Sequence, residues 1–309
     1  MAALQLLGME WRPEASPEGP REAGIGQRRG SRDRLPPVWG ASHPASGSHL
    51  PAEGTAPPYA GAFRVVAPCP APQKPHTLPR PTAGFRLKIL ALDTSTEYCS
   101  IALLLDSEVL SREVLAERRH SELILPMLQQ LLEETGLTLA QLDGIAFGAG
   151  PGSFTGLRIA CGVTQGLAFA AGLPVTAICT LEALAQEAGD DNVITALDAR
   201  MNEIYHAAYT KSAEGWRAVS EPALCLPRHA PFVPGYSWMG CGSGFSVYDE
   251  ALRARYDGSI SYIISGLRPR AHAMVQLAAP RFAKGLGIDP ADAMPLYIRN
   301  KVALKERER

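Results

Sequence analysis

The spacing of apolar residues predicts a series of strands that begins near residue 88. Residues 88–93, Lys-Ile-Leu-Ala-Leu-Asp, form a mostly apolar run, which is typical of a central strand buried on both faces. Strands are also expected at 100–105 and 109–115, and the short polar link between them predicts a hairpin. The first three strands are therefore expected to be antiparallel neighbours.

An amphipathic helix follows, for which Ser121 is the expected N-cap and Gly136 the expected end. Pro126 lies one turn inside this helix and predicts a bend. The apolar residues of the helix fall on one face, and they are Leu123, Ile124, Met127, Leu128, Leu131 and Leu132.

Helices and strands alternate in the next part of the chain. Strands are expected at 144–147 and 174–178, and helices at 154–171 and 181–187. Three antiparallel strands followed by this alternation predict an α/β fold, in which a mixed sheet carries helices on its faces.

A second round of the pattern begins with a strand at 193–197. This strand leads to Asp198, much as the first strand ends in Asp93, and the echo predicts two related lobes. The pattern weakens beyond Gly215. The remaining expected elements are strands at 203–209, near Trp238 and at 260–264, and a helix at 272–284.

The first 86 residues show neither a helical nor a strand period, and residues 1–85 hold 15 of the 26 prolines. Because this composition buries too little apolar surface to offset the entropy of ordering, we expect the extension 1–86 to be disordered. A flexible tail, an upstream start codon taken for the true one and a targeting peptide are all open explanations. The lobes are then expected at 87–190 and 191–295, with a C-terminal tail at 296–309.

Charge and cysteine usage narrow the class of protein. Lys plus Arg (30) nearly balances Asp plus Glu (31), so any contact with RNA is expected to be local or shared with a partner. The six cysteines include no Cys-x-x-Cys pair, which favours reduced, buried thiols. No apolar run reaches about 18 residues and no secretory signal opens the chain, so we expect a cytoplasmic protein without a membrane helix.

The most distinctive motif is Gly-Ala-Gly-Pro-Gly-Ser-Phe-Thr-Gly-Leu-Arg at 148–158. A glycine-rich turn between a strand and a helix can direct backbone N–H groups at an anion. Gly150, Gly152 and Ser153 are therefore candidate contacts of a phosphate or nucleotide, in an active or vestigial site. A tight structural turn is the alternative. No Gly-Lys-Ser/Thr follows, so this is not a Walker A loop.

The turn Asp93-Thr94-Ser95-Thr96 is a second candidate, and Asp198 occupies the matching place in the second lobe. An Asp followed by hydroxyl residues can hold Mg²⁺ and phosphates, although the same residues also favour simple turns. No metal site is expected, because the sequence has no His-x-x-x-His and no His-Glu-x-x-His.

Small residues recur on the second predicted helix, at Gly162, Gly166 and Ala170. Glycine costs about 1 kcal/mol in a helix interior, so several together need a reason. The close approach of a second helix supplies one, and the spacing leaves open whether that helix lies in this chain or in a partner.

These motifs together resemble the TsaB family. The resemblance runs in order, at the family's spacing, over about 87–305, and the Gly-Pro-Gly-Ser-Phe-Thr-Gly-Leu-Arg run is highly specific. The chain departs at Met201-Asn202, where family members often have Arg-Gly. The matching segments are 89–96, 120–123, 150–158, 198–200 and 295–299.

The resemblance implies the fold shared by actin, sugar kinases and the Hsp70 ATPase, with two ribonuclease H-like lobes. It also implies a role in making threonylcarbamoyladenosine next to the anticodon of tRNA, as the partner of the transferase TsaD and together with the ATPase TsaE. The chain lacks the metal-binding His pair of TsaD, so no catalytic residue is expected here. A homodimer of the isolated chain, contact with tRNA through the complex, and weak ATP or ADP binding shared with it stay open.

By the same resemblance, the first-lobe helices at 120–132 and 154–171 form the dimerisation face. The expected interface residues are His120, Leu123, Met127, Phe154, Arg158, Gly162, Gly166 and Ala170.

Two other functions compete with the partner-subunit hypothesis. An ATP-dependent phosphotransferase of the same fold would use Asp93 to hold Mg²⁺ and Asp198 as the base. A peptidase finds little support, because the sequence has no nucleophile elbow and no plausible triad around its seven histidines.

Overall fold

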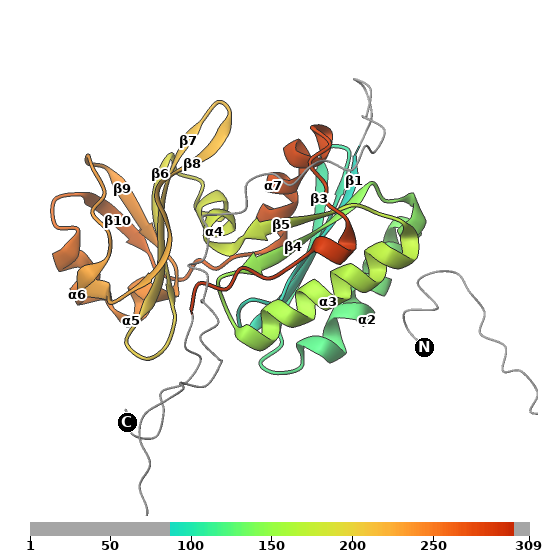
Figure 1. The fold of residues 1–309 in the computed structure, drawn as a ribbon. Helices are drawn as coiled ribbons and strands as arrows, with labels where there is room; N and C mark the ends of the chain where they lie inside the picture. The colour runs from blue at the N-terminus through green and yellow to red at the C-terminus, as the bar shows by residue number, and fades with distance from the viewer. Residues whose placement is uncertain (1–86, 300–309) are drawn as a thin grey trace, which may run out of the picture. The chain divides into compact units, whose positions relative to one another are not determined.

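A computed structural model describes residues 87–299, and within them the chain builds two five-stranded sheets (Figure 1). The first sheet has the strand order β3-β2-β1-β4-β5. Strands β1, β2 and β3 are antiparallel neighbours, whereas β4 and β5 run parallel to β1, so the predicted mixed sheet is confirmed. Its strands are β1 (Lys88–Asp93), β2 (Tyr98–Leu105), β3 (Glu108–Leu115), β4 (Gly144–Gly150) and β5 (Val175–Cys179).

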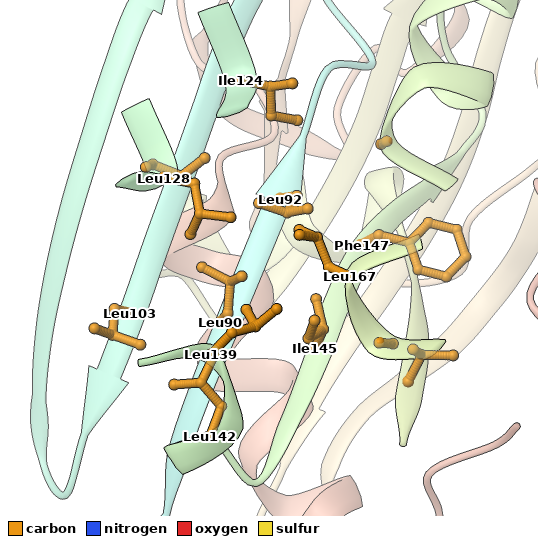
Figure 2. Packing of buried hydrophobic residues seen from close by; sticks show 14 of the residues in the cluster. Leu90, Leu92, Leu103, Ile124, Leu128, Leu139, Leu142, Ile145, Phe147 and Leu167 are labelled. Carbon is orange, nitrogen blue, oxygen red and sulfur yellow. The ribbon is translucent and has the colours of Figure 1, made fainter. Parts of the chain in front are cut away.

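The central strand β1 is buried on both faces, because its side chains alternate between two hydrophobic clusters. Leu90 and Leu92 pack with the residues under helices α2 (His120–Thr135) and α3 (Phe154–Ala171), as Figure 2 shows. Ile89 and Ala91 point to the other face, where helix α7 (Ala271–Ala283) packs. The apolar run at 88–93 is thus explained by one helical layer on each side of the sheet.

Helix α2 ends as predicted, with Gly136 in the left-handed conformation at φ 65°. Its start differs from the prediction, because the helix begins at His120 and no side chain caps it. The His120 ring lies 2.9 Å from the Thr96 carbonyl oxygen through its Nε2, and this contact ties the first turn to the β1–β2 loop. Ser121 is therefore an exposed residue inside the first turn rather than the N-cap.

The second sheet has the order β10-β9-β6-β7-β8. Strand β8 was not predicted from the sequence. It is an edge strand that is half-exposed along most of its length, and its pairing with β7 contains bulges. A half-buried strand gives no clear apolar period. The strands are β6 (Asn192–Asp198), β7 (Ile204–Ser212), β8 (Gly215–Cys225), β9 (Trp238–Cys241) and β10 (Ile260–Ile264).

The remaining helices are short. Helix α4 packs between the two sheets and contacts strands of both. Helices α5 and α6 have fewer than eight residues and belong to the second lobe, and the other three are single-turn 3-10 helices. They are α4 (Thr180–Ala188), α5 (Ser243–Val247), α6 (Asp249–Arg255), η1 (Leu139–Gln141), η2 (Pro227–His229) and η3 (Pro290–Asp292).

Helix α7 departs from the lobe boundaries expected from the sequence. It falls within 191–295, the range predicted for the second lobe, but it packs on the first sheet against β1, β2 and β4. The Ala271 N–H that opens the helix donates to the Ser100 hydroxyl on β2 at 2.9 Å. The chain therefore returns to the first sheet after completing the second, and the extension 1–86 lies outside the described residues.

The cysteines largely follow the prediction. Cys99, Cys161, Cys179 and Cys241 are free and buried, whereas Cys225 is free and half-buried. Cys69 lies outside the described residues. Within 87–299, no helix is long and apolar enough to cross a membrane.

The core of the second sheet contains a buried histidine, His206 on β7. Its Nε2 lies 2.7 Å from the Tyr256 hydroxyl, while its Nδ1 is buried with no hydrogen-bond partner among the described residues. The Tyr256 hydroxyl in turn donates to the Pro231 carbonyl oxygen at 2.9 Å. Burial, assisted by the positive charge of Arg255, lowers the pKa of His206 to about 4.

We expect this histidine to make the protein less stable in mild acid. Because the folded pKa lies below the unfolded value near 6.5, only the unfolded chain takes up the proton as the pH falls from about 6.5 to 4. Stability should fall by roughly 3 kcal/mol across that window. Thermal unfolding is measured between pH 4 and 8. The melting temperature should fall less toward acid pH for His206→Gln than for the control His229→Gln, which changes an exposed histidine. The same pH dependence in both variants would contradict the claim that burial keeps His206 neutral in the folded chain.

Candidate functional site

The glycine loop and the Asp93 turn, predicted as separate candidates, lie directly against each other. The Ser153 N–H donates to the Ser95 carbonyl oxygen at 2.8 Å. The Thr94 hydroxyl donates to the Gly156 carbonyl oxygen at 2.7 Å. The two loops are therefore joined by two hydrogen bonds, and both Thr94 and Ser95 are buried.

Glycines are required at this contact because the two backbones approach closely. A Cβ on Gly152 would lie 2.6 Å from the Ser95 carbonyl oxygen, and one on Gly156 would collide with the Thr94 carbonyl oxygen. A Cβ on Gly148 would collide with the Asp93 carboxylate. Packing against the 93–96 turn thus gives these glycines a structural reason.

The N-terminus of α3 also forms hydrogen bonds within the chain. Ser153 is the N-cap, and its hydroxyl oxygen accepts the Gly156 N–H at 3.3 Å. The backbone N–H of Ser153 itself donates to the Ser95 carbonyl oxygen. Two of the N–H groups at the start of α3 therefore already have partners within the chain. Phosphate or nucleotide binding at Gly150, Gly152 and Ser153 stays a prediction.

Asp93 is almost completely buried, at 1% exposure. Its carboxylate accepts the Ser95 N–H at 3.3 Å and the Ser95 hydroxyl at 3.0 Å. Burial outweighs these bonds and raises the pKa of Asp93 to about 7. The charge of Glu113 acts in the same direction.

Asp198, the matching residue at the end of β6, lies in a turn of its own. Its carboxylate accepts the Arg200 N–H at 2.9 Å and the Tyr248 hydroxyl at 3.3 Å. Its backbone N–H donates to the Ser243 hydroxyl at 3.0 Å. Each of the two predicted aspartates is therefore bonded within its immediate surroundings. Within 87–299, no group of three or more His, Cys, Asp or Glu residues could hold a metal ion.

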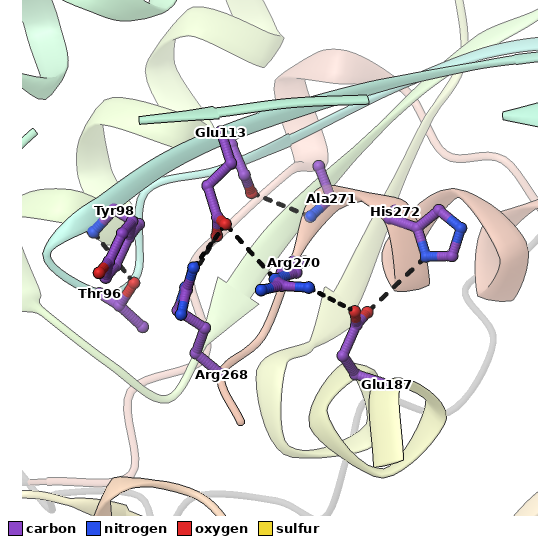
Figure 3. A network of polar contacts seen from close by, with 9 residues as sticks. Thr96, Tyr98, Glu113, Glu187, Arg268, Arg270, Ala271 and His272 are labelled. Carbon is purple, nitrogen blue, oxygen red and sulfur yellow. Dashed lines mark hydrogen bonds and ion pairs between the residues drawn. The ribbon is translucent and has the colours of Figure 1, made fainter. Parts of the chain in front are cut away.

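A polar network that the sequence did not reveal joins β3 to the segment before α7 (Figure 3). The Arg268 guanidinium donates to both Glu113 oxygens, at 2.9 and 2.6 Å. Arg270 lies between Glu113, at 3.5 Å, and Glu187, at 3.2 Å. His272 lies 3.8 Å from Glu187. These residues are distant in sequence, so no local motif could have indicated the network.

The predicted interface residues divide into three groups. Phe154, Arg158, Gly162, Gly166 and Ala170 are exposed on α3, whereas Leu123 and Met127 on α2 are half-buried. His120 does not fit the prediction, because it is buried at 6% exposure by its contact with Thr96.

The exposed side of α3 is open around its two internal glycines. A Cβ built on Gly162 or on Gly166 would meet nothing within 4 Å, in contrast to the glycines of the loop. Phe169, which the sequence reading missed, is 81% exposed. We call the exposed residues Phe154, Arg158, Gly162, Gly166, Phe169 and Ala170 the open face of α3.

Comparison with known proteins places the chain in a family. It is 38% identical to the "tRNA threonylcarbamoyladenosine biosynthesis protein TsaB" of Haemophilus influenzae over 233 residues, which cover 71% of this chain and 97% of the relative. The protein of the same name from Escherichia coli K12 is 37% identical over 71% of this chain and 98% of its own length. The chain belongs to the TsaB family.

Solved structures and a family model agree with TsaB membership. Two structures from Pseudomonas aeruginosa, one of YeaZ and one of a protein with similarity to the peptidase YeaZ, share 40% and 39% sequence identity with this chain. They superpose with TM-scores of 0.63 and 0.65, over 68% and 69% of this chain and 99% and 100% of theirs. The model "TsaD: tRNA N6-adenosine threonylcarbamoyltransferase" matches residues 105–235. The predicted two-lobed α/β fold is confirmed.

Proposed function

We propose that this TsaB-family chain is a non-catalytic subunit of the machinery that forms threonylcarbamoyladenosine in tRNA, and that it binds and activates a TsaD-type transferase. The named relatives from H. influenzae and E. coli support the pathway. The match of residues 105–235 to the transferase family supports a fold shared with the partner.

The observation that carries the partner role is the open face of α3. Gly162 and Gly166 place no side chain where a second helix would lie, so the two backbones can approach closely. Phe154 and Phe169 are 40% and 81% exposed near the two ends of the same helix. Burying such aromatic side chains contributes about 25 cal/mol per Å², and aromatic residues are common anchors of interfaces.

The candidate catalytic groups favour the partner role over a phosphotransferase. Asp93 is buried and its carboxylate is bonded to the Ser95 hydroxyl, and the glycine loop packs on the 93–96 turn. An in-line phosphotransferase needs a carboxylate that can reach a metal ion and a loop whose backbone N–H groups face phosphate oxygens, whereas these two loops pack on each other.

The rest of the assembly follows as part of the same proposal. A TsaE-type ATPase joins the pair, tRNA is bound through the complex, and the site of action is the cytoplasm. ATP or ADP, where it binds, is shared with the partner subunits rather than held by the glycine loop alone.

Reconstitution tests this function. The full chain, a TsaD homologue and a TsaE homologue are mixed with ATP, tRNA and threonylcarbamoyl adenylate as the donor of the threonylcarbamoyl group. We expect modified adenosine to form at least roughly tenfold faster with the chain than without it, whereas the chain alone neither modifies tRNA nor hydrolyses ATP. Steady ATP hydrolysis by the isolated chain would instead support the phosphotransferase, and unchanged modification in its absence would refute the partner role.

A further inference from the structure

The last described residues, 295–299, bridge the two sheets, and we call them the strap. At one end the Leu296 N–H donates to the Ala149 carbonyl oxygen on β4 at 2.7 Å. At the other end the Arg299 guanidinium donates to the Ala199 carbonyl oxygen at 2.8 Å and pairs with Glu203 at 2.7 Å. Residues 296–299, the described part of the expected C-terminal tail, are therefore held at both ends.

Tyr297 lies between these two anchors and contacts the open face of α3. Its hydroxyl oxygen accepts the Arg158 Nε–H at 3.0 Å. The Tyr297 and Phe154 rings have centroids 5.5 Å apart, and the Arg158 guanidinium carbon lies 3.9 Å from the Phe154 centroid. Arg158 is thus exposed, but it lies over the Phe154 ring and 5.9 Å from the Tyr297 centroid, and its hydrogen bond to the Tyr297 hydroxyl fixes its direction.

We propose that Tyr297 is a positioning residue for partner binding, which holds Arg158 in one orientation on the open face of α3. This inference rests on the proposed function, because it concerns the same contact with the TsaD-type subunit. Immobilising a flexible side chain during association costs about 0.5–1.5 kcal/mol, so a guanidinium that is already fixed binds more tightly. Its planar fork is suited to a carboxylate of the partner.

The strap is anchored to the second lobe through Arg299. The turn that receives Arg299 has three successive non-glycine residues in the left-handed region, Arg200, Met201 and Asn202, at φ 62°, 55° and 60°. This unusual backbone presents carbonyl oxygens to the guanidinium, which contacts those of Ala199 and Arg200. The second sheet therefore influences the open face of α3 indirectly, by anchoring the strap that carries Tyr297.

A double-mutant cycle on the full chain tests this inference. Affinity for the TsaD homologue is measured by calorimetry for Tyr297→Phe, Arg158→Ala and the double variant. Tyr297→Phe keeps the ring and removes only the hydroxyl, so we expect affinity to fall by roughly threefold to tenfold. In the Arg158→Ala background the same change should have no effect, because Tyr297 acts through Arg158. Arg299→Gln should behave like Tyr297→Phe, and Arg299→Lys should restore part of the affinity.

Tyr262→Phe is the matched control. Tyr262 lies on the edge strand β10, and its hydroxyl donates to the Asp190 carboxylate at 2.6 Å. The control therefore also removes one phenol hydroxyl and its hydrogen bond, and it should leave the affinity unchanged. Thermal unfolding confirms that each variant is folded. If Tyr297→Phe binds as tightly as the unsubstituted protein, or if its effect simply adds to that of Arg158→Ala, the positioning role is refuted while the proposed function stands. If the unsubstituted protein does not bind the TsaD homologue with or without ATP, the proposed function fails and this inference with it.

Discussion

Gly166→Leu is expected to weaken binding of the TsaD homologue by at least roughly 100-fold without destabilising the free chain. In the free chain the new side chain enters open space, because even a Cβ at Gly166 meets nothing within 4 Å. Leucine also favours a helix interior over glycine by up to about 1 kcal/mol, so the melting temperature should stay the same or rise. At a close helix-to-helix contact, the same side chain forces the backbones apart, and a loss of about 3 kcal/mol in packing corresponds to about 100-fold in affinity.

Weaker binding together with an unchanged or higher melting temperature distinguishes a lost interface from a misfolded variant. A variant that lost binding through misfolding would melt earlier, whereas this one should not. Ala254→Leu is the control, since it adds bulk at an exposed helical position on α6. Affinity is measured by light scattering and calorimetry, and stability by thermal unfolding. Undiminished binding by Gly166→Leu would exclude the open face of α3 from the interface.

The sequence predicted most of the first sheet because each of its elements has a strong local period. The run at 88–93 is buried on both faces, and α3 begins and ends where its pattern does, at Phe154 and Ala171. Strand β8 was missed because an edge strand is half-exposed. The return of α7 to the first sheet was missed because a helix pattern indicates an apolar face without indicating which sheet covers it.

The candidate site was predicted in part for the same physical reason. The glycine loop and the Asp93 turn were both recognised, yet their mutual contact depends on tertiary approach that local spacing does not encode. His120 was assigned to the interface from family position, whereas its ring is buried against Thr96. Tyr297 and Arg299 act through residues more than 90 positions away, so only the folded chain reveals the strap.

Asp93→Asn should stabilise the free chain at alkaline pH and leave its activating role intact. The pKa of Asp93 is raised from 3.8 to about 7 by burial, so the folded chain keeps a proton that the unfolded chain has lost between these values. The contribution of Asp93 to stability is therefore largest below about pH 4, falls as the pH rises, and is lowest above about pH 7. The full change amounts to roughly 4 kcal/mol. An asparagine has no proton to lose and should remove most of this dependence.

Unfolding in urea at pH 5 and pH 8 measures the effect, with Asp143→Asn as the control at an exposed carboxylate that accepts the Lys88 N–H at 2.7 Å. At pH 8 we expect Asp93→Asn to be more stable than the unsubstituted protein by up to about 4 kcal/mol, reduced by any weakening of the bonds to Ser95. The same variant should still support tRNA modification with the TsaD homologue. If it binds the transferase normally but modification stops, Asp93 takes part in chemistry. In that case the buried carboxyl is a catalytic group kept at a cost in stability, and the chain is a catalytic rather than a non-catalytic subunit.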